Sequence, residues 1–343
     1  MDFELLKKIV HTPGAPGHEK PIRDVVEELI KPHVDELYTD PIGNLIARKK
    51  GKGPRVMLAA HLDEISLIST HVDDNGFIRF STLGGFDADT LTTQRVWVHG
   101  KEMIPGVIGS KPIHIQSDEE KKTKTKLKNL FIDVGLPAEE VKELVPNGTP
   151  VTRMSDLIKL GNSVSGKSLD NRLSVYILVK ALQEAESCNS DLYAVFTVQE
   201  EVGLRGARVA AQQIQPEIGI ALDITLANDL PGVGDHDKCT TLGKGIGIKV
   251  MDKSIICTPE LVSHLEEIAV SRSIAYQREV LTAGGTDTSA MQYLMGIGSH
   301  VTCISCPTRY VHSTVESAAV TDIEAGVKLA TACIETIGNY KMK

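Results

Sequence analysis

The 343-residue sequence has few cysteines, and it has no long apolar run. Six cysteines are sparse for this length, which disfavours a disulfide-stabilised extracellular fold and fits a reducing compartment. No stretch approaches the roughly 18 consecutive apolar residues of a membrane span. The N-terminal segment also lacks the apolar core of a signal peptide. We therefore expect a cytoplasmic protein without a membrane partner.

Two of the cysteines, Cys303 and Cys306, form a C-x-x-C pair. Such a pair could be redox-active or could supply half of a zinc knuckle. No second pair accompanies it, and it lies inside the apolar run HVTCISC. We interpret both residues as buried strand cysteines.

An excess of positive charge is also absent, because the formal net charge is −8. Nothing in this balance points to nucleic acid or to an anionic membrane surface as a partner. The hydrophobic fraction of 41% is nevertheless ordinary for a globular protein, so a sizeable core is expected. The length favours one large domain with an insertion, or two domains.

Most of the chain alternates between strand-like and helix-like patterns, which is typical of an α/β fold. We expect a mixed central sheet flanked by helices. The predicted helices cover 3–10, 21–31, 171–186, about 206–213, 260–273 and 321–337. The predicted strands cover 34–40, 44–50, 55–60, 192–198, 218–223, 242–251, 276–281 and 300–307. The segment AGGTDTSAM is expected to lead into a further helix.

The pattern changes between about Leu67 and Ser165. Short strand-like segments separated by Gly or Asn turns predict a small inserted β-barrel there. A charged run within it is interpreted as a solvated surface, followed by a helix near 137–145. We therefore expect a catalytic domain formed by 1–66 and 166–343 and an inserted β domain formed by 67–165.

The strand predicted for 192–198 runs directly into two adjacent acids, Glu200 and Glu201. In open α/β sheets the ligand site lies beyond the carboxyl ends of the strands. Other residues share this context: His61 and Asp63 after one strand, Asp223 ending another, and His312 shortly after a third. Together with Asp170 at the start of a helix, the candidate site residues are His61, Asp63, Asp170, Glu200, Glu201, Asp223 and His312.

Histidines and carboxylates that converge at one sheet edge are typical ligands for borderline divalent metals such as zinc, cobalt or manganese. Each residue alone is a weak signal, because a single polar residue at a strand end is more often structural. The combination predicts a metal centre.

Five motifs in this order resemble the M42 family of cocatalytic metallo-aminopeptidases, also called TET aminopeptidases. They are HLDE, SLDNR, VQEEVGLRGA, ALD and RYVHS, and LKNLFIDVG and GGTDTSAM extend the resemblance over nearly the whole chain. The resemblance implies an enzyme that removes N-terminal residues from peptides, with two divalent ions per chain.

The resemblance also implies a role for each site residue. Glu200 would be the general acid/base, and Asp63 would hydrogen-bond the imidazole of His61 and fix its tautomer. Asp170 would bridge the two ions and precede a cis peptide bond to Asn171. The other ligands would be His61 and Asp223 at one ion, and Glu201 and His312 at the other.

For the inserted domain the resemblance implies subunit assembly beside the active-site entrance, in tetrahedral shells of twelve subunits. The segment FDADT stands where many relatives have a Trp-containing segment. This difference leaves open the shape of the subunit interface or of the S1 pocket, which holds the first side chain of the substrate. Side-chain preference at the N-terminal residue is open as well, because it depends on loops near 234–253 and 282–290. Arg309 could pair with an acidic substrate, although we favour a structural Arg.

Three other functions fit parts of the sequence. A glycoside hydrolase is one, since some relatives carry an endoglucanase label, but adjacent acids could not easily lie on opposite sides of a glycosidic bond. A binding shell with a structural metal is another, although structural zinc usually has Cys and His ligands. A cocatalytic deacylase or carboxypeptidase would share the ligands and differ in which end of the substrate it grips.

Overall fold

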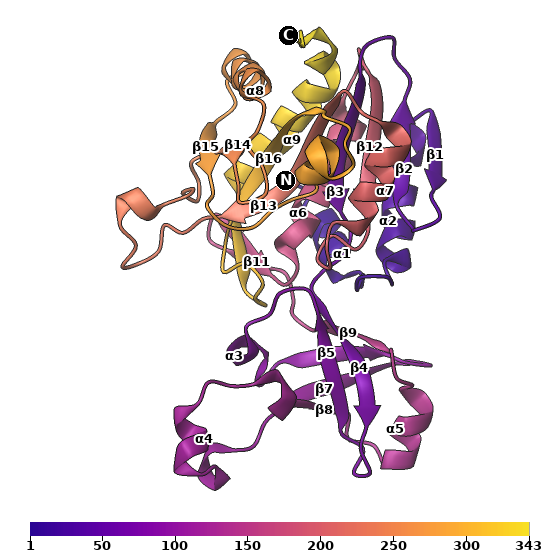
Figure 1. The fold of residues 1–343 in the computed structure, drawn as a ribbon, viewed down its shortest axis with the longest axis vertical. Coiled ribbons are helices and arrows are strands. Elements are labelled where there is room, and N and C mark those ends of the chain that lie inside the picture. Colours follow the sequence, from indigo (N-terminus) through magenta and orange to yellow (C-terminus); the bar gives the residue numbers. More distant parts are fainter. Residues whose placement is uncertain (343) are drawn as a thin grey trace.

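The computed structural model describes the backbone of residues 1–342, which form two lobes (Figure 1). The larger lobe contains an 11-stranded mixed sheet with helices on both faces, and the smaller lobe is a closed β-barrel. Both ends of the chain lie in the larger lobe, so the barrel is an insertion (Figure 1). The expected α/β class with an inserted barrel is confirmed.

The middle of the large sheet is parallel. Strand β3 pairs in parallel with β12 and with β13, and β13 pairs in parallel with β16. Across the sheet the order is β1 (Glu36–Thr39), β2 (Leu45–Lys49), β12 (Asp191–Thr197), β3 (Arg55–His61), β13 (Ile218–Leu226), β16 (His300–Arg309), β17 (Glu316–Ala319), β11 (Ser163–Gly166) and β10 (Ile158–Leu160). Off this path, β14 (Ile246–Met251) pairs with β15 (Tyr276–Val280) and with β16.

Side chains of the central strands alternate between two apolar cores, because successive residues of a strand point to opposite faces. In β3, Val56 and Leu58 pack in the core on one face, while Met57 and Ala59 pack in the core on the other. A strand buried on both faces reads as a continuous apolar run. This is why segments such as 192–198 were recognisable as sheet interior.

Helices cover the two faces unequally. The more heavily covered face carries α1 (Phe3–His11), α2 (Lys20–Ile30), α6 (Leu169–Glu184), α8 (Pro259–Ser271) and α9 (Val320–Thr336). The other face carries α7 (Arg205–Ile214) and a single π-helical turn at Ala290–Leu294. The helix expected after AGGTDTSAM is therefore only this short turn.

The barrel is built from antiparallel strands around its own core, with Leu67, Val96 and Ile132 fully buried. Its strands, in order, are β4 (Ser66–Val72), β5 (Ile78–Leu83), β8 (Phe131–Asp133), β7 (Met103–Gly109), β6 (Arg95–His99) and β9 (Pro150–Arg153). Short helices α3 (Ala88–Leu91), α4 (Asp118–Lys122) and α5 (Ala138–Leu144) lie in its connections.

The sheet pairing bears on the limits of the insertion. Strand β10 and all of β11 except Gly166 fall inside the predicted insertion, 67–165, but both strands pair within the large sheet. A local pattern identifies a short strand without showing which sheet it joins. We propose that the inserted domain ends between Arg153 and Ile158.

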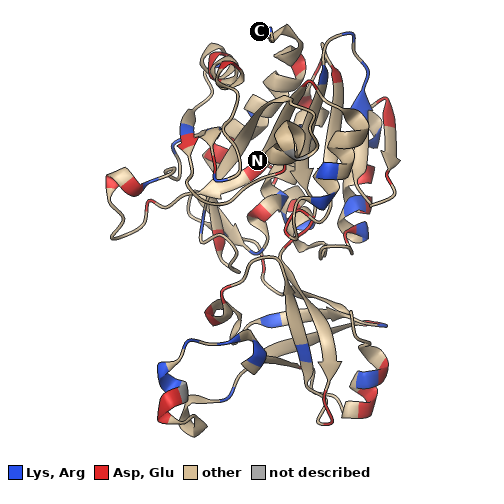
Figure 2. Ribbon diagram, viewed as in Figure 1, with Lys and Arg blue, Asp and Glu red and all other residues tan. Residues whose placement is uncertain are grey.

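Charged residues of both signs are interspersed over both lobes (Figure 2). None of the described helices is long and apolar enough to cross a bilayer. Among the described residues all six cysteines are free, and Cys303 and Cys306 are fully buried in β16, as interpreted from the sequence.

One buried network fixes the exit of the central strand β12. The side-chain oxygen of Asn44 accepts the N–H of Val198 at 3.0 Å, and its amide nitrogen donates to the carbonyl of Gly206 at 2.9 Å. The same nitrogen donates to Asp40 at 2.7 Å. The turn after β1, the end of β12 and the start of α7 are thereby joined immediately beside Glu200.

Gly206 is required because a Cβ there would lie 2.3 Å from Asn44 Oδ1 and 2.4 Å from the carbonyl oxygen of Val198. Gly206→Ala should therefore lower the free energy of unfolding by about 1–3 kcal/mol, the usual cost of overpacking. Urea denaturation measures this. The control is Gln212→Ala on the exposed face of the same helix, which should stay within about 0.5 kcal/mol of the parent. Equal stability of the two variants would contradict the packing argument.

Candidate metal centre

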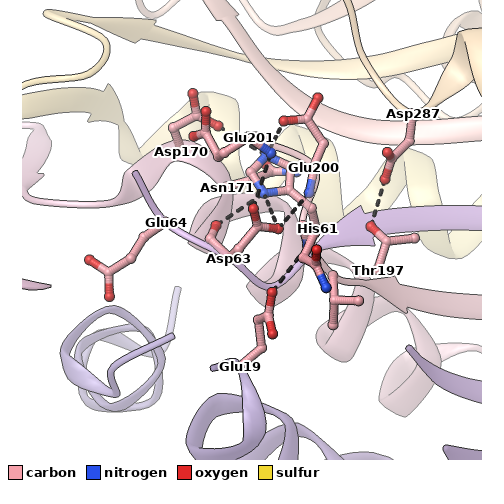
Figure 3. A network of polar contacts seen from close by, with 12 residues as sticks. Glu19, His61, Asp63, Glu64, Asp170, Asn171, Thr197, Glu200, Glu201 and Asp287 are labelled. Atoms are coloured by element: carbon pink, nitrogen blue, oxygen red, sulfur yellow. Dashed lines mark hydrogen bonds and ion pairs between the residues drawn. The ribbon is translucent and has the colours of Figure 1, made fainter. Parts of the chain in front are cut away.

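The candidate site lies at the edge of the sheet where three parallel neighbours, β12, β3 and β13, come to their carboxyl ends. His61 is the last residue of β3, and Glu200 and Glu201 follow β12 by a few residues. Because β3 and β12 lie side by side with Thr197 opposite His61, the two acids must emerge beside the imidazole. Figure 3 shows His61, Asp170, Glu200 and Glu201 gathered at one place.

Asp170 lies at the middle of the cluster. Its Oδ1 is 3.3 Å from Nε2 of His61, and its Oδ2 is 3.3 Å from Nε2 of His312. Asp223 Oδ1 lies 3.9 Å from the His61 nitrogen, and Glu201 Oε2 lies 3.7 Å from the His312 nitrogen. The carboxylate of Asp170 thus has one oxygen directed at each imidazole.

Glu200 approaches His61 as well, with Oε2 3.9 Å from Nε2. The peptide bond between Asp170 and Asn171 is cis, as the family resemblance implied. Asp223 differs from expectation in one respect, because β13 continues past it to Leu226. The sequence suggested a strand ending at Asp223, since an acid interrupts the apolar run there, but backbone pairing with β16 continues through Ile224, Thr225 and Leu226.

The contact expected between Asp63 and His61 is made by a different atom. Nδ1 of His61 lies 3.0 Å from the main-chain carbonyl oxygen of Asp63, and 3.5 Å from its carboxylate. A carbonyl can only accept, so in the neutral ring Nδ1 carries the proton and Nε2 presents its lone pair to the cluster. The tautomer of His61 is thus fixed as expected, but by the main-chain carbonyl of Asp63.

The carboxylate of Asp63 instead holds the two acids. Its Oδ1 accepts the N–H of Glu200 and its Oδ2 accepts the N–H of Glu201, both at 3.0 Å. Asp63 is fully buried. The sequence singled out Asp63 and its neighbour His61 but not these two N–H contacts, because side-chain spacing in an extended strand does not show which backbone groups lack partners.

Glu316, which the sequence analysis did not single out, makes an equivalent arrangement on the other side. It is fully buried, and its carboxylate accepts the N–H of Asp170 at 3.0 Å and that of His312 at 2.8 Å. Burial raises its pKa to about 7. The charge of Arg153 opposes this rise, and the charge of Asp170 adds to it. An acid among the small residues of the strand ESAA was the signal that could have revealed it.

A second overlooked cluster lies behind the site. Glu64 is fully buried and accepts from Lys167 Nζ at 2.6 Å and from Ser168 Oγ at 2.5 Å. Arg172 Nη2 lies 3.6 Å from the other oxygen of Glu64. The segment just after His61 is thus joined to the segment that carries Asp170. Two further buried acids near the site are Glu19, which accepts the N–H of Gln199, and Asp287, which accepts from Thr197.

Burial and neighbouring negative charge disfavour the charged forms of Glu200, Glu201 and Asp223. Burial, followed by the charge of Asp170, raises the pKa of Glu201 to about 8. Burial likewise raises the pKa of Asp223 to about 8 and that of Glu200 well above its usual value, although His61 opposes both shifts. The protein by itself would therefore hold protons here, and a divalent cation would displace them.

The pKa values of the two histidines are shifted by the same concentration of negative charge. Burial opposes their protonation, yet neighbouring carboxylates raise the pKa of His312 to about 9 and that of His61 well above its usual value. Burial also disfavours the charged form of Asp170, but hydrogen bonds from both histidines bring the pKa of this carboxyl far below its ordinary value.

The donor set fits divalent cations. Groups of imidazole and carboxylate atoms lie within 4.8 Å of one another in three overlapping sets. One contains His61, Asp170 and Asp223, the second contains Asp170, Glu201 and His312, and the third contains His61, Glu200 and Glu201. Among the described residues Glu201 Oε1 is buried without a hydrogen-bond partner, as expected for an atom that awaits a ligand.

A cavity of about 360 Å³ opens onto this cluster. Beyond the acids and histidines its wall is formed by Ile224, Thr225, Leu226, Lys249, Leu281, 283–286 and Val311. A larger cavity of about 740 Å³ lies between the 13–23 segment and the barrel, but its lining brings no comparable set of ligands together. The smaller cavity has the size and the convergent polar groups of a substrate site.

Comparison with known proteins adds an independent observation. The family model described as M42 glutamyl aminopeptidase matches residues 43–329. A putative aminopeptidase of Acetivibrio thermocellus is 42% identical over 333 residues, which cover 97% of this chain and 98% of that protein.

Solved structures are similar over the same length. An aminopeptidase from the archaeon Desulfurococcus kamchatkensis has a TM-score of 0.92 and 39% identity, with 97% of this chain and 94% of that chain covered. The TET1 peptidase of Pyrococcus horikoshii has a TM-score of 0.87 and 35% identity, covering 97% and 98% of the two chains. That peptidase can assemble into a tetrahedron or a large octahedral shell.

Cation binding should stabilise the folded chain, because it removes repulsion among acids that only the folded state brings together. Adding Zn²⁺ or Co²⁺ to chelator-treated protein should raise the Tm measured by calorimetry. Asp170→Asn, which loses an anionic oxygen between the two histidines, should remove most of that increase. Asp156→Asn, at an exposed acid outside the cluster, is the control and should keep it. An increase of equal size in all three proteins would place the cation elsewhere.

Proposed function

Because the chain belongs to the M42 family of glutamyl aminopeptidases, we propose that it is a dinuclear metal-dependent aminopeptidase that removes N-terminal residues from peptides. One observation supports the dinuclear centre above all others: the two oxygens of Asp170 face His61 and His312, each at 3.3 Å. A bridging carboxylate between two ions needs this arrangement.

We propose two sets of ligands that share Asp170. His61 and Asp223 would complete the first set, and Glu201 and His312 would complete the second. Oxygen-rich sets with one imidazole each suit zinc, cobalt or manganese, and zinc is the ion we expect by default. Divalent ions held there would act as Lewis acids on the scissile carbonyl and on the attacking water.

Glu200 is left free of both sets and is the proposed general acid/base. It is placed beside the cluster by the N–H contact with Asp63, and burial raises its pKa. In the proposed reaction its carboxylate takes a proton from the attacking water and then delivers it to the nitrogen of the departing amine. Asp63 acts through the backbone, since it fixes where Glu200 and Glu201 leave the strand.

The substrate would be a peptide with a free N-terminus, whose first side chain enters the cavity of about 360 Å³. Residues 283–286 of the expected specificity loops line this cavity, as does Lys249. The guanidinium of Arg309 is paired with a carboxylate of the chain itself. It makes two hydrogen bonds to Asp229, at 2.8 and 2.7 Å, which supports its structural reading.

We also propose that the chain assembles into a closed shell of the TET type, of twelve subunits, with the barrel at subunit contacts near the entrance. The support is the similarity to a peptidase that forms tetrahedral or octahedral shells. A cytoplasmic location is proposed on the free cysteines of the described chain.

Glu200→Gln tests the division of labour between the adjacent acids. The amide cannot accept a proton from water, so release of product from an unblocked aminoacyl anilide should fall by about 10²- to 10⁴-fold. Metal content, measured by elemental analysis, should remain that of the parent protein.

Glu201→Gln is the matched comparison, one residue further along the same loop. It should lose metal together with activity, because the proposed ligand is removed. Loss of metal from Glu200→Gln instead would favour the third ligand set, in which both acids coordinate, and would remove Glu200 from its proposed catalytic role.

A further inference from the structure

Glu316 joins two residues of the metal centre that are far apart in the sequence. It is the first residue of β17 and is fully buried. Its Oε1 accepts the N–H of His312 at 2.8 Å, and its Oε2 accepts the N–H of Asp170 at 3.0 Å. Both acceptor atoms of one carboxylate are therefore used by backbone groups of two proposed ligands.

His312 has the most exposed side chain of the five proposed ligands. It lies in the connection between β16 and β17, outside any strand pairing, and its side chain is 37% exposed. Tyr310 and His312 both have left-handed backbone angles, with φ of 58° and 65°. Non-glycine residues adopt this region only when their surroundings hold them there.

The other half of the centre has the same construction. Asp63 accepts the N–H groups of Glu200 and Glu201 with its two oxygens, as Glu316 does for Asp170 and His312. In these contacts each buried carboxylate accepts from main-chain N–H groups, and the Asp63 carboxylate in addition lies 3.5 Å from Nδ1 of His61. Two residues outside the proposed ligand sets thus fix the backbone from which four of the site residues project.

We propose that Glu316 is a positioning residue, which holds the backbones of Asp170 and His312 at the separation that a divalent ion between their side chains requires. The proposal rests on the proposed dinuclear centre. It predicts that Glu316 affects metal affinity without touching the metal, as residues that orient ligands commonly do.

The chemistry of the two contacts makes Glu316→Gln an informative change. A carboxylate can accept from both N–H groups, whereas an amide has one acceptor oxygen and an NH₂ group that can only donate. In Glu316→Gln one of the two backbone N–H groups must therefore face the NH₂ group, which is also a donor. The size of the side chain stays the same.

The chain offers a matched control in Asp322. This fully buried carboxylate also accepts two backbone N–H groups, from Gly243 at 2.7 Å and Gly245 at 2.8 Å. None of these three residues belongs to the proposed ligand sets. Asp322→Asn should lose the same kind of contact at a place where metal affinity does not depend on it.

The experiment measures Zn²⁺ affinity of the chelator-treated full chain by competition with a chromophoric chelator, and folding by circular dichroism. Glu316→Gln should bind at least one of the two ions about 10- to 100-fold more weakly than the parent protein. Its hydrolytic activity should recover as the Zn²⁺ concentration is raised. Asp322→Asn should bind Zn²⁺ as the parent does, whatever its loss of thermal stability.

Zn²⁺ affinity of Glu316→Gln within about twofold of the parent would overturn the inference. If that variant does not fold, Glu316→Asp takes its place, because it keeps the charge and is too short to reach both N–H groups at once. Parental affinity of folded Glu316→Asp would overturn the inference as well. Absence of Zn²⁺ binding by the parent would instead overturn the proposed function, and this inference with it.

Discussion

Mutual repulsion among buried acids is the constraint on which the rest of the site depends. Asp170, Glu200, Glu201 and Asp223 lie at one sheet edge, and burial raises the pKa of all but Asp170. Asp170 escapes because two imidazoles, when protonated, donate to it through Nε2. A fold that gathers acids in this way is costly unless cations bind among them. The arrangement of acids that destabilises the metal-free folded chain therefore also makes the site suited to binding two ions.

The surrounding structure keeps these side chains in place mainly through backbone contacts. Asp63 and Glu316 each accept two N–H groups from residues that face the cluster, and the carbonyl of Asp63 holds His61. Further out, Asn44 fixes the end of β12, so the positions of the two acids follow from the sheet register. Precise placement is thereby built from rigid elements and does not depend on the loops alone.

Much of this could be predicted from the sequence. Continuous apolar runs identified the central strands, and ligand-type residues after several of them predicted that His61, Glu200 and His312 would meet. The supporting acids were harder to find, because the N–H groups they hold become visible only when the backbone path is known. Asp63 was expected to act through its carboxylate on His61, and Glu316 was not expected at all. The predicted insertion, 67–165, includes β10 and most of β11, which pair within the large sheet, because a short strand carries no signal of its partner.

The central claim is metal-dependent removal of an N-terminal residue. The measurement that tests it most directly compares one peptide with a free N-terminus and the same peptide acetylated, using chelator-treated protein before and after addition of Zn²⁺, Co²⁺ or Mn²⁺. The account predicts release of the first amino acid from the free peptide alone, and only after metal is restored. Cleavage of the acetylated peptide, or undiminished release in chelator, would contradict it.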